Sequence, residues 1–145
     1  MKIYVASSWR NPLYEGIVEG LRSLGYEVYD FKHPDGDEGF HWSRVEDSWQ
    51  DWTMKEYRDA LGSEYAQFGF YRDFDAMKAA DVCVLLLPCG RSAHLEAGWM
   101  KGAGKKVVAY IPTFERIEPE LMYAMLDDIA LSEIELVKYL KQYEQ

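Results

Sequence analysis

The sequence predicts an α/β protein built on a doubly wound parallel sheet of four or five strands. Short β-rich runs alternate along the chain with segments whose apolar residues recur at helical spacing. The run DVCVLLLP at 81–88 is apolar throughout its centre, which is typical of a strand buried on both faces of a parallel sheet. Strands that alternate with helices favour a parallel sheet covered on both sides. The 145 residues are the size of one domain, so a single domain is expected over 1–145.

The first part of the chain is predicted to form two strands and the helix between them. KIYVAS at 2–7 is a short β-rich run. Asn11 is suited to cap a helix and Pro12 to occupy its first turn, and apolar residues follow at helical spacing. Gly25 is suited to end that helix. YEVYDF at 26–31 is then expected to be the second strand.

The second part of the chain repeats this alternation. After the strand near 82–87, AHLEAGWMKGAG at 93–104 is predicted to be a helix that ends in glycines. KKVVAYI at 105–111 is expected to be the fourth strand, and the weak run IAL at 129–131 a short fifth one. SEIELVKYLKQY at 132–143 opens with a capping box and is predicted to be the last helix.

The segment 33–71 breaks the alternation and is interpreted as a helical, aromatic-rich insert between the second and third strands. It begins with a turn-rich loop, and SRVEDSWQDWTMKEYRDAL at 43–61 is expected to be helical. One hypothesis is a long crossover helix whose aromatic residues pack on the sheet. The other is a lid or a subunit contact, because large aromatic residues serve both purposes.

Composition excludes several classes of function. The formal net charge of −9 argues against a nucleic-acid duplex as a partner, because phosphate binding needs a basic surface. No window is apolar over the roughly 18 residues of a membrane span, so no membrane partner is expected. The cysteines and histidines lack metal-type spacing, and we expect neither a metal nor a cofactor. Without an export signal, reduced thiols and a cytoplasmic location are expected.

Three segments are predicted to meet at the edge where open parallel sheets bind their ligands, the carboxyl ends of the strands. These are ASSWRN at 6–11, PCGRSAHLE at 88–96 and the end of VVAYIPTFE at 107–115. The first two combine hydroxyl groups, one arginine each and a helix start, which suits a phosphate or a carboxylate. Taken alone, each of Arg10 and Arg91 is better explained as ordinary surface charge.

Glu96 is a charged residue among apolar neighbours near this edge. If Ser92 caps the helix, Glu96 lies just beyond its third position. Leu95 and Trp99, four residues apart, are expected to face the core, so that Glu96 lies beside them at the pocket wall. There it would be partly desolvated but favoured by the helix N-terminus. The alternative is a solvated glutamate that merely favours the helix dipole.

A cluster of carboxylates precedes the third strand. Asp73 and Asp75 are suited to start a helix, and Asp81 to end one. Asp73 has a chemical role only if it reaches Glu96, because two carboxylates in one pocket can share acid, base and nucleophile duties at a glycosidic bond.

Three stretches together resemble the nucleoside 2-deoxyribosyltransferase-like family, which includes nucleoside 5′-monophosphate N-hydrolases. They are KIYVASSWRN, RDFDAMKAADVCVLLLP and SAHLEAGWMKGAGKKV, and they cover about residues 2–11 and 71–110. The resemblance implies a flavodoxin-like sheet. It also implies an enzyme, a glycosidase or a deoxyribosyltransferase, that cleaves or transfers at the N-glycosidic bond of a nucleoside or nucleoside 5′-monophosphate.

The resemblance implies three catalytic residues. Glu96 would be the nucleophile that attacks the anomeric carbon and forms a glycosyl-enzyme ester. Asp73 would pass a proton to the departing base. Tyr4 would hold the nucleophile carboxylate.

It also implies a set of substrate-binding residues. Ser8 and Arg10 match positions at which the nucleotide hydrolases bind the 5′-phosphate, and Arg91 and Ser92 would add the helix N-terminus. Gly90 departs from the family pattern, because the transferases tend to carry a base-recognising aspartate there and the hydrolases a serine. The base is therefore left open.

Two other functions are compatible with these residues. A non-catalytic nucleotide-binding or sensing module would keep Arg10 and the helix terminus, and an NAD-cleaving glycohydrolase would also use a pocket glutamate. In every case the partner is a small-molecule nucleoside or nucleotide. Members of the resembled family are often homo-oligomers. Since Trp42, Trp49 and Trp52 are a large apolar load, we expect a homo-oligomer that uses the insert or an adjacent helix.

Overall fold

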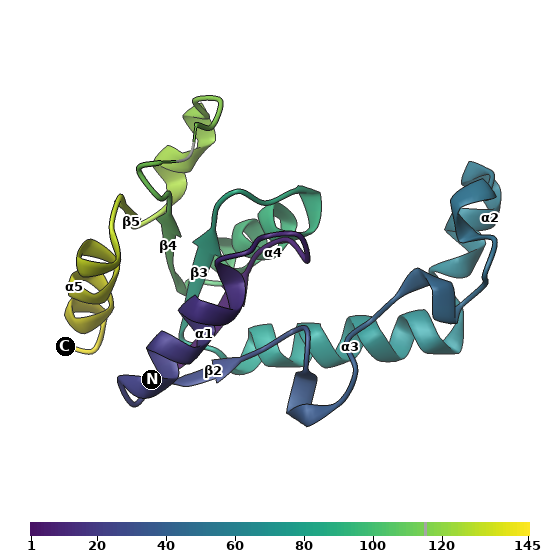
Figure 1. The fold of residues 1–145 in the computed structure, drawn as a ribbon, viewed down its shortest axis with the longest axis horizontal. Helices are drawn as coiled ribbons and strands as arrows, with labels where there is room; N and C mark the ends of the chain where they lie inside the picture. The colour runs from purple at the N-terminus through teal and green to yellow at the C-terminus, as the bar shows by residue number, and fades with distance from the viewer. Residues whose placement is uncertain (115) are drawn as a thin grey trace.

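Five parallel strands form one sheet in the computed structural model, which describes residues 1–114 and 116–145 (Figure 1). The strands are β1 (Lys2–Ala6), β2 (Glu27–Tyr29), β3 (Val82–Leu86), β4 (Lys106–Tyr110) and β5 (Asp128–Ala130). They lie in the order β2-β1-β3-β4-β5, which is the order of flavodoxin-like doubly wound sheets. The predicted fold class is confirmed, including a short fifth strand at the weak run near residue 129.

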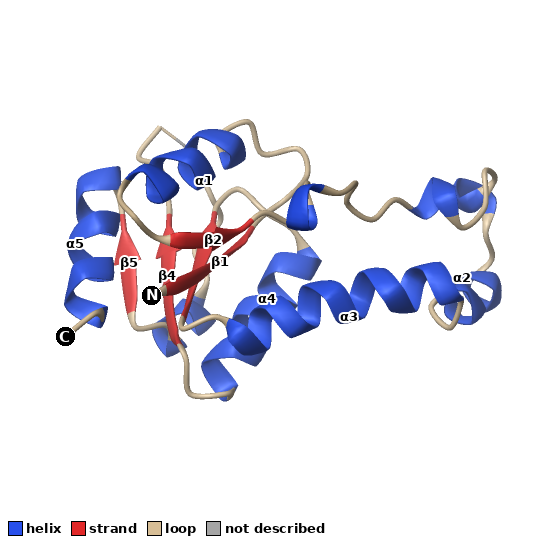
Figure 2. Cartoon of the chain, turned by 90° about the horizontal axis from the view of Figure 1, so that it is seen from below, coloured by secondary structure: helices blue, strands red, loops and turns tan. Residues whose placement is uncertain are grey.

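Helices cover both faces of the sheet. They are α1 (Tyr14–Ser23), α2 (Met54–Ala60), α3 (Glu64–Ala79), α4 (Arg91–Gly102) and α5 (Glu133–Tyr143). Figure 2 shows α1 and α5 on one face and α3 and α4 on the other, while α2 lies far from the sheet. Gly25, with φ +93°, follows the end of α1 as predicted. Within the described ranges, no helix is both long and apolar enough to cross a bilayer.

The central strand β3 is buried along its whole length and contributes side chains to two core layers. Val84 and Leu86 pack in the layer of α1 and α5, whereas Cys83 and Leu85 pack in the layer of α3 and α4. Tyr4 of β1 is paired with Cys83 and therefore faces the α3 and α4 layer as well. This register directs the tyrosine towards the helices that bear the predicted carboxylates.

Helix α1 begins at Tyr14, later than predicted, because Asn11 serves the loop before it. The Asn11 side chain is buried, and its Oδ1 accepts a hydrogen bond from the Leu13 N–H at 2.9 Å. Its Nδ2 donates to Ser7 Oγ at 3.1 Å and to the Pro88 carbonyl at 3.2 Å. Asn11 thus links the loop after β1 to the loop after β3, at the edge where the site was expected.

The segment 43–61 is less helical than predicted. Its helical parts are α2 and two three-residue 3₁₀ turns, Trp42–Arg44 and Trp49–Asp51. Aromatic packing explains the difference: the Trp42 ring lies edge-on to Trp52 and Tyr57, at centroid distances of 5.7 and 6.0 Å. These contacts hold segment 43–61 in a folded-back arm that projects from the sheet (Figure 1). The interpretation of this segment as a crossover helix packed on the sheet is therefore wrong.

The crossover to β3 is made by α3 instead. This helix begins at Glu64, inside the predicted insert, and runs unbroken to the sheet. Asp73 and Asp75 consequently lie within the helix and do not start it, which corrects their interpretation as helix-start residues. Asp81 does not end the helix, but follows it and accepts a hydrogen bond from the Lys2 backbone N–H at 2.8 Å.

Candidate active site

A pocket of about 370 Å³ lies at the carboxyl ends of the first three strands. It is lined by Ser7, Trp9, Phe31, Phe40, His41, Trp42, Ser43, Trp49, Asp73, Ser92 and Glu96. Two carboxyl groups, three hydroxyl groups and one imidazole are its polar part, and tryptophan and phenylalanine rings make up the rest. A larger hollow of about 640 Å³ lies beside β2, but neither Glu96 nor Asp73 lines it. The smaller pocket is therefore the candidate site.

Glu96 lies against the sheet and does not extend into bulk solvent. The hydroxyl group of the buried Tyr4 donates a hydrogen bond to Glu96 Oε2. Burial raises the pKa of the Glu96 carboxyl to about 7, and the nearby charge of Asp73 acts in the same direction. The hydrogen bond from Tyr4 opposes both effects because it favours the ionised form. At neutral pH this carboxyl is thus close to its midpoint of ionisation.

The orientation of α4 differs from the prediction. The helix begins at Arg91 after the N-cap residue Gly90, so Ser92 is not the cap. Leu95 is 76% exposed and Trp99 37% exposed, so the expectation that they face the core is wrong. The buried face of α4 consists of Ala93, Ala97 and Met100. Small alanine side chains let the helix pack closely on the sheet. Because this face of α4 is turned towards the sheet, Glu96 lies within reach of Tyr4.

Asp73 is held by a second tyrosine. The Tyr29 hydroxyl donates a hydrogen bond to Asp73 Oδ1 at 2.7 Å. Burial raises the pKa of Asp73, while the hydrogen bond from Tyr29 and the positive charge of Arg72 partly offset that rise. Asp73 and Glu96 come from different helices and line the same pocket. The sequence reasoning missed Tyr29, although its place in the second strand was predicted.

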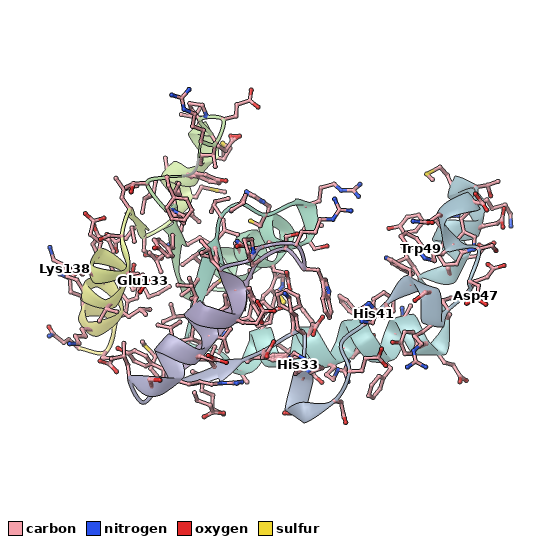
Figure 3. All side chains as sticks on the ribbon, viewed as in Figure 1. His33, His41, Asp47, Trp49, Glu133 and Lys138 are labelled. Carbon is pink, nitrogen blue, oxygen red and sulfur yellow. The ribbon has the colours of Figure 1, made fainter. Side chains whose placement is uncertain are left out.

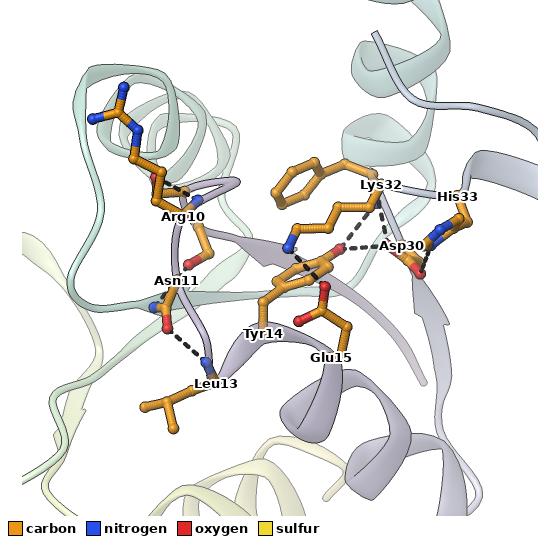
Figure 4. A network of polar contacts seen from close by, with 11 residues as sticks. Arg10, Asn11, Leu13, Tyr14, Glu15, Asp30, Lys32 and His33 are labelled. Carbon is orange, nitrogen blue, oxygen red and sulfur yellow. Dashed lines mark hydrogen bonds and ion pairs between the residues drawn. The ribbon is translucent and has the colours of Figure 1, made fainter. Parts of the chain in front are cut away.

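The predicted substrate-binding residues lie at different distances from the pocket. Ser92 belongs to its lining, as does Ser7, which was not predicted. Ser7 is buried and donates to the Leu86 carbonyl at 3.0 Å. Four predicted residues lie outside the lining: Ser8, Arg10, Gly90 and Arg91. Arg10 is exposed, and its side chain extends away from Asn11 in Figure 4.

Aromatic residues that were not predicted as site residues form the pocket walls. Trp9 and His41 lie 4.7 Å apart between ring centroids, and Phe40 packs edge-on to Trp42 at the same centroid distance. Gly39 permits this arrangement, because a Cβ there would lie 2.7 Å from the Trp9 ring and 2.6 Å from a backbone carbonyl oxygen. Figure 3 shows His41 between the sheet and the arm, with Trp49 out on the arm.

A buried cation stabilises the outer wall of the pocket. Lys32 Nζ forms an ion pair with Glu15 at 2.7 Å and lies 5.6 Å from the centroid of the Trp9 ring and 5.2 Å from that of Tyr14. Asp30 accepts hydrogen bonds from the Tyr14 hydroxyl and from the Lys32 backbone N–H (Figure 4). The network connects α1 to the loop after β2, and the charge of Lys32 is already neutralised by its partner.

Other chemistry at this edge finds little support. Over residues 1–114 and 116–145, no group of three or more histidine, cysteine, aspartate and glutamate side chains is arranged to hold a metal ion. Burial raises the pKa of the Cys89 thiol to about 12, with a contribution from the charge of Glu96. Cys89 is therefore a protonated thiol at neutral pH and a poor nucleophile.

Comparison with known structures finds this architecture in other proteins. The chain is similar to a 2-deoxyribosyltransferase from the psychrotolerant bacterium Bacillus psychrosaccharolyticus, with a TM-score of 0.64 and 22% identity over 94% of this chain and 90% of that one. It is also similar to a CMP N-glycosidase from Clostridium botulinum, with a TM-score of 0.55 and 17% identity over 97% and 99%. No protein-family model and no curated protein sequence matches the chain. The chain shares the fold of these two enzymes.

The raised pKa of Glu96 predicts a pH-dependent stability. Its pKa is about 7 in the folded protein and near 4.5 in an unfolded chain, so the folded state binds the proton more tightly. The associated stability is fully present below about pH 4.5 and is lost as the pH rises through about 7. Glu96→Gln removes this loss, so the variant should gain stability relative to wild type between pH 5 and pH 8.

Chemical denaturation at pH 5 and at pH 8 measures the difference in stability between wild type and Glu96→Gln. Glu19→Gln, at an exposed position of α1, controls for the loss of one negative charge. A gap between wild type and Glu96→Gln that does not change with pH would contradict the assignment of a buried, proton-binding carboxyl.

Proposed function

We propose that this protein is an enzyme that cleaves or transfers at the N-glycosidic bond of a nucleoside or nucleoside 5′-monophosphate, with Glu96 as the nucleophile. The observation that carries the proposal is the pair of carboxyls, Glu96 and Asp73, which line one aromatic pocket and each accept a hydrogen bond from a tyrosine hydroxyl. The resemblance of the sequence to the nucleoside 2-deoxyribosyltransferase-like family and the shared fold with two enzymes of this chemistry support it.

The two carboxyls divide the reaction between them. The Glu96 carboxylate attacks the anomeric carbon while the carbon–nitrogen bond breaks, and the electron pair of that bond leaves with the base. Asp73 donates a proton to the base as it departs. The resulting glycosyl ester on Glu96 is then attacked by water, which gives hydrolysis, or by a second base, which gives transfer. Two displacements at one carbon retain its configuration.

The protonation states of the pair set the working pH. Attack needs an ionised Glu96, and departure of the base needs a protonated Asp73. Burial raises the pKa of both carboxyls, and the charge of Asp73 raises that of Glu96 further. The form with one proton on the pair, held by Asp73, is the active one, and turnover should depend on pH as a bell whose two limbs belong to the coupled pair.

The aromatic walls supply the surface that a planar base requires. Rings from the loops after β1 and β2 and from the insert surround the two carboxyls. Gly90 contributes no side chain, and the space that a Cβ would occupy there is open. Stacking on the walls therefore replaces a hydrogen-bonding side chain at position 90 as the source of base affinity.

The second element of specificity is whether the sugar carries a 5′-phosphate. None of the residues that line the pocket in the described chain is lysine or arginine, which favours a neutral nucleoside. A 5′-phosphate would instead use the N-terminus of α4 near Ser92, together with Arg10 and Arg91 at the rim. The two substrates thus differ in their dependence on these arginines.

We further propose a homo-oligomer that assembles through the outer faces of α3 and α4. Phe70, Phe74 and Trp99 form a continuous row of ring contacts across the two helices, at centroid distances of 5.3 and 4.8 Å. Leu95 lies beside this row and is exposed. The tryptophans of the insert, which first suggested assembly, are instead partly buried within the arm.

Glu96→Gln should lower turnover by about 10²-fold or more, because an amide cannot form the glycosyl ester. The substrate is first identified by incubating the wild-type protein with nucleosides, nucleoside monophosphates and NAD and detecting free base by chromatography. Wild-type turnover by Glu96→Gln would refute its role as the nucleophile. Binding without release of base from any of these compounds would indicate a sensing module, and release of nicotinamide an NAD glycohydrolase.

Arg10→Ala separates the two substrate forms. If Arg10 contacts a 5′-phosphate, kcat/KM for the monophosphate should fall by about 10- to 150-fold, the equivalent of about 1.5–3 kcal/mol for a charge-assisted contact. The value for the matching nucleoside should hardly change. Equal losses on both substrates would assign Arg10 a structural role.

Leu95→Arg should shift the protein towards the monomer, because it places a charge within the proposed contact face. Light scattering at micromolar concentrations measures the mass of wild type and variant. Ile134→Arg is the matched control, since Ile134 is 84% exposed on α5, away from this face. A monomeric wild-type protein would contradict the assembly.

A further inference from the structure

We infer that Tyr29 is a positioning residue for Asp73, and that the pairing of Tyr29 with Tyr4 on neighbouring strands fixes where the two pocket carboxyls lie relative to each other. The inference rests on the proposed function for its effect on turnover. Its structural part, the hold of Tyr29 on Asp73, can be tested without any substrate.

The two tyrosines form a matched pair on the sheet. Tyr4 and Tyr29 are direct partners in the parallel register of β1 and β2, so their side chains leave the sheet on the same face. Their rings are stacked, with centroids 5.7 Å apart and an angle of 11° between the planes. The two hydroxyl groups consequently lie side by side at a spacing set by the sheet.

Each hydroxyl holds one carboxyl. Tyr4 donates to Glu96 on α4, and Tyr29 donates to Asp73 on α3 at 2.7 Å. The two carboxyls belong to helices separated in sequence by the whole of β3. The backbone ladder between the strands and the stacked rings hold the two hydroxyl groups next to each other, so the tyrosine pair sets the separation of nucleophile and acid.

The hydrogen bond also decides which oxygen of Asp73 carries the proton. Oδ1 accepts the hydrogen bond from Tyr29, so Oδ2 is the oxygen available to protonate a departing base. The titratable and charged groups near Asp73 are Tyr29 from β2, Tyr4 from β1, Arg72 from its own helix and Glu96 from α4. Tyr29 and Arg72 favour the ionised carboxyl, so removal of the Tyr29 hydroxyl should raise the pKa of Asp73.

Tyr29→Phe tests the inference because it keeps the stacked ring and removes only the hydroxyl group. We expect the pKa of the Asp73 carboxyl, followed by carbon-13 NMR, to rise, while that of Glu96 changes less. We expect kcat to fall on the order of 10-fold with little change in KM, since the acid is misplaced and not the substrate. The kcat profile, whose limbs belong to the coupled pair, should move to higher pH.

Tyr143→Phe is the matched control. Tyr143 also donates to an aspartate, Asp128 Oδ2 at 2.5 Å, but on α5 and β5 outside the pocket. This variant should leave the titration of Asp73 and the kcat profile unchanged. An Asp73 titration and kcat profile in Tyr29→Phe equal to those of wild type would overturn the inference.

A measurement on the wild-type protein covers the case in which Tyr29→Phe does not fold. With tyrosine labelled at the ring carbon that bears the hydroxyl, the Tyr29 signal should follow the ionisation of Asp73, and the Tyr4 signal that of Glu96. A Tyr29 signal that is flat or follows Glu96 would overturn the inference. If no substrate is turned over, these titrations still support or overturn it, so its failure is distinguishable from failure of the proposed function.

Discussion

The hydrogen bond between the Tyr4 hydroxyl and the Glu96 carboxyl connects β1, in the sheet, to α4, the helix that borders the pocket. A carboxyl buried at this depth is costly unless a donor is present, and Tyr4 supplies that donor from a strand that cannot move independently of the core. The same contact depends on the close packing of α4 against the sheet through Ala93 and Ala97. The chemical result is a carboxyl with a pKa of about 7, close to half ionised at neutral pH.

The walls of the pocket have a different origin from its floor. The floor comes from the sheet and from α3 and α4, whereas the rings come from loops and from an arm that leaves the sheet. Gly39 and Gly69 allow close packing where the arm joins the rest of the chain. A side chain at Gly39 would collide with Trp9, and one at Gly69 with Phe40. The carboxyls and the aromatic walls thus come from separate parts of the chain, so the arm can vary without moving the carboxyls.

Electrostatics favours a small, planar, largely uncharged ligand. The chain carries a net charge of −9. Its buried lysine, Lys32, is neutralised by Glu15 and stabilises the Trp9 ring. Arg10 and Arg91 are exposed and lie outside the pocket lining. Under the proposed function, a phosphate would therefore be bound outside the pocket interior, and the interior would contact the base and the sugar.

The sequence by itself determined the parallel sheet, because strand runs, caps and glycines are local signals that agree with one another along the chain. It also pointed to Glu96, Asp73 and Tyr4 by resemblance. It did not reveal the arm, where irregular aromatic contacts override helical propensity, or the face of α4, which depends on how closely alanines approach the sheet. Tyr29 became visible only through strand register, since no local pattern shows which residues of two distant strands lie side by side.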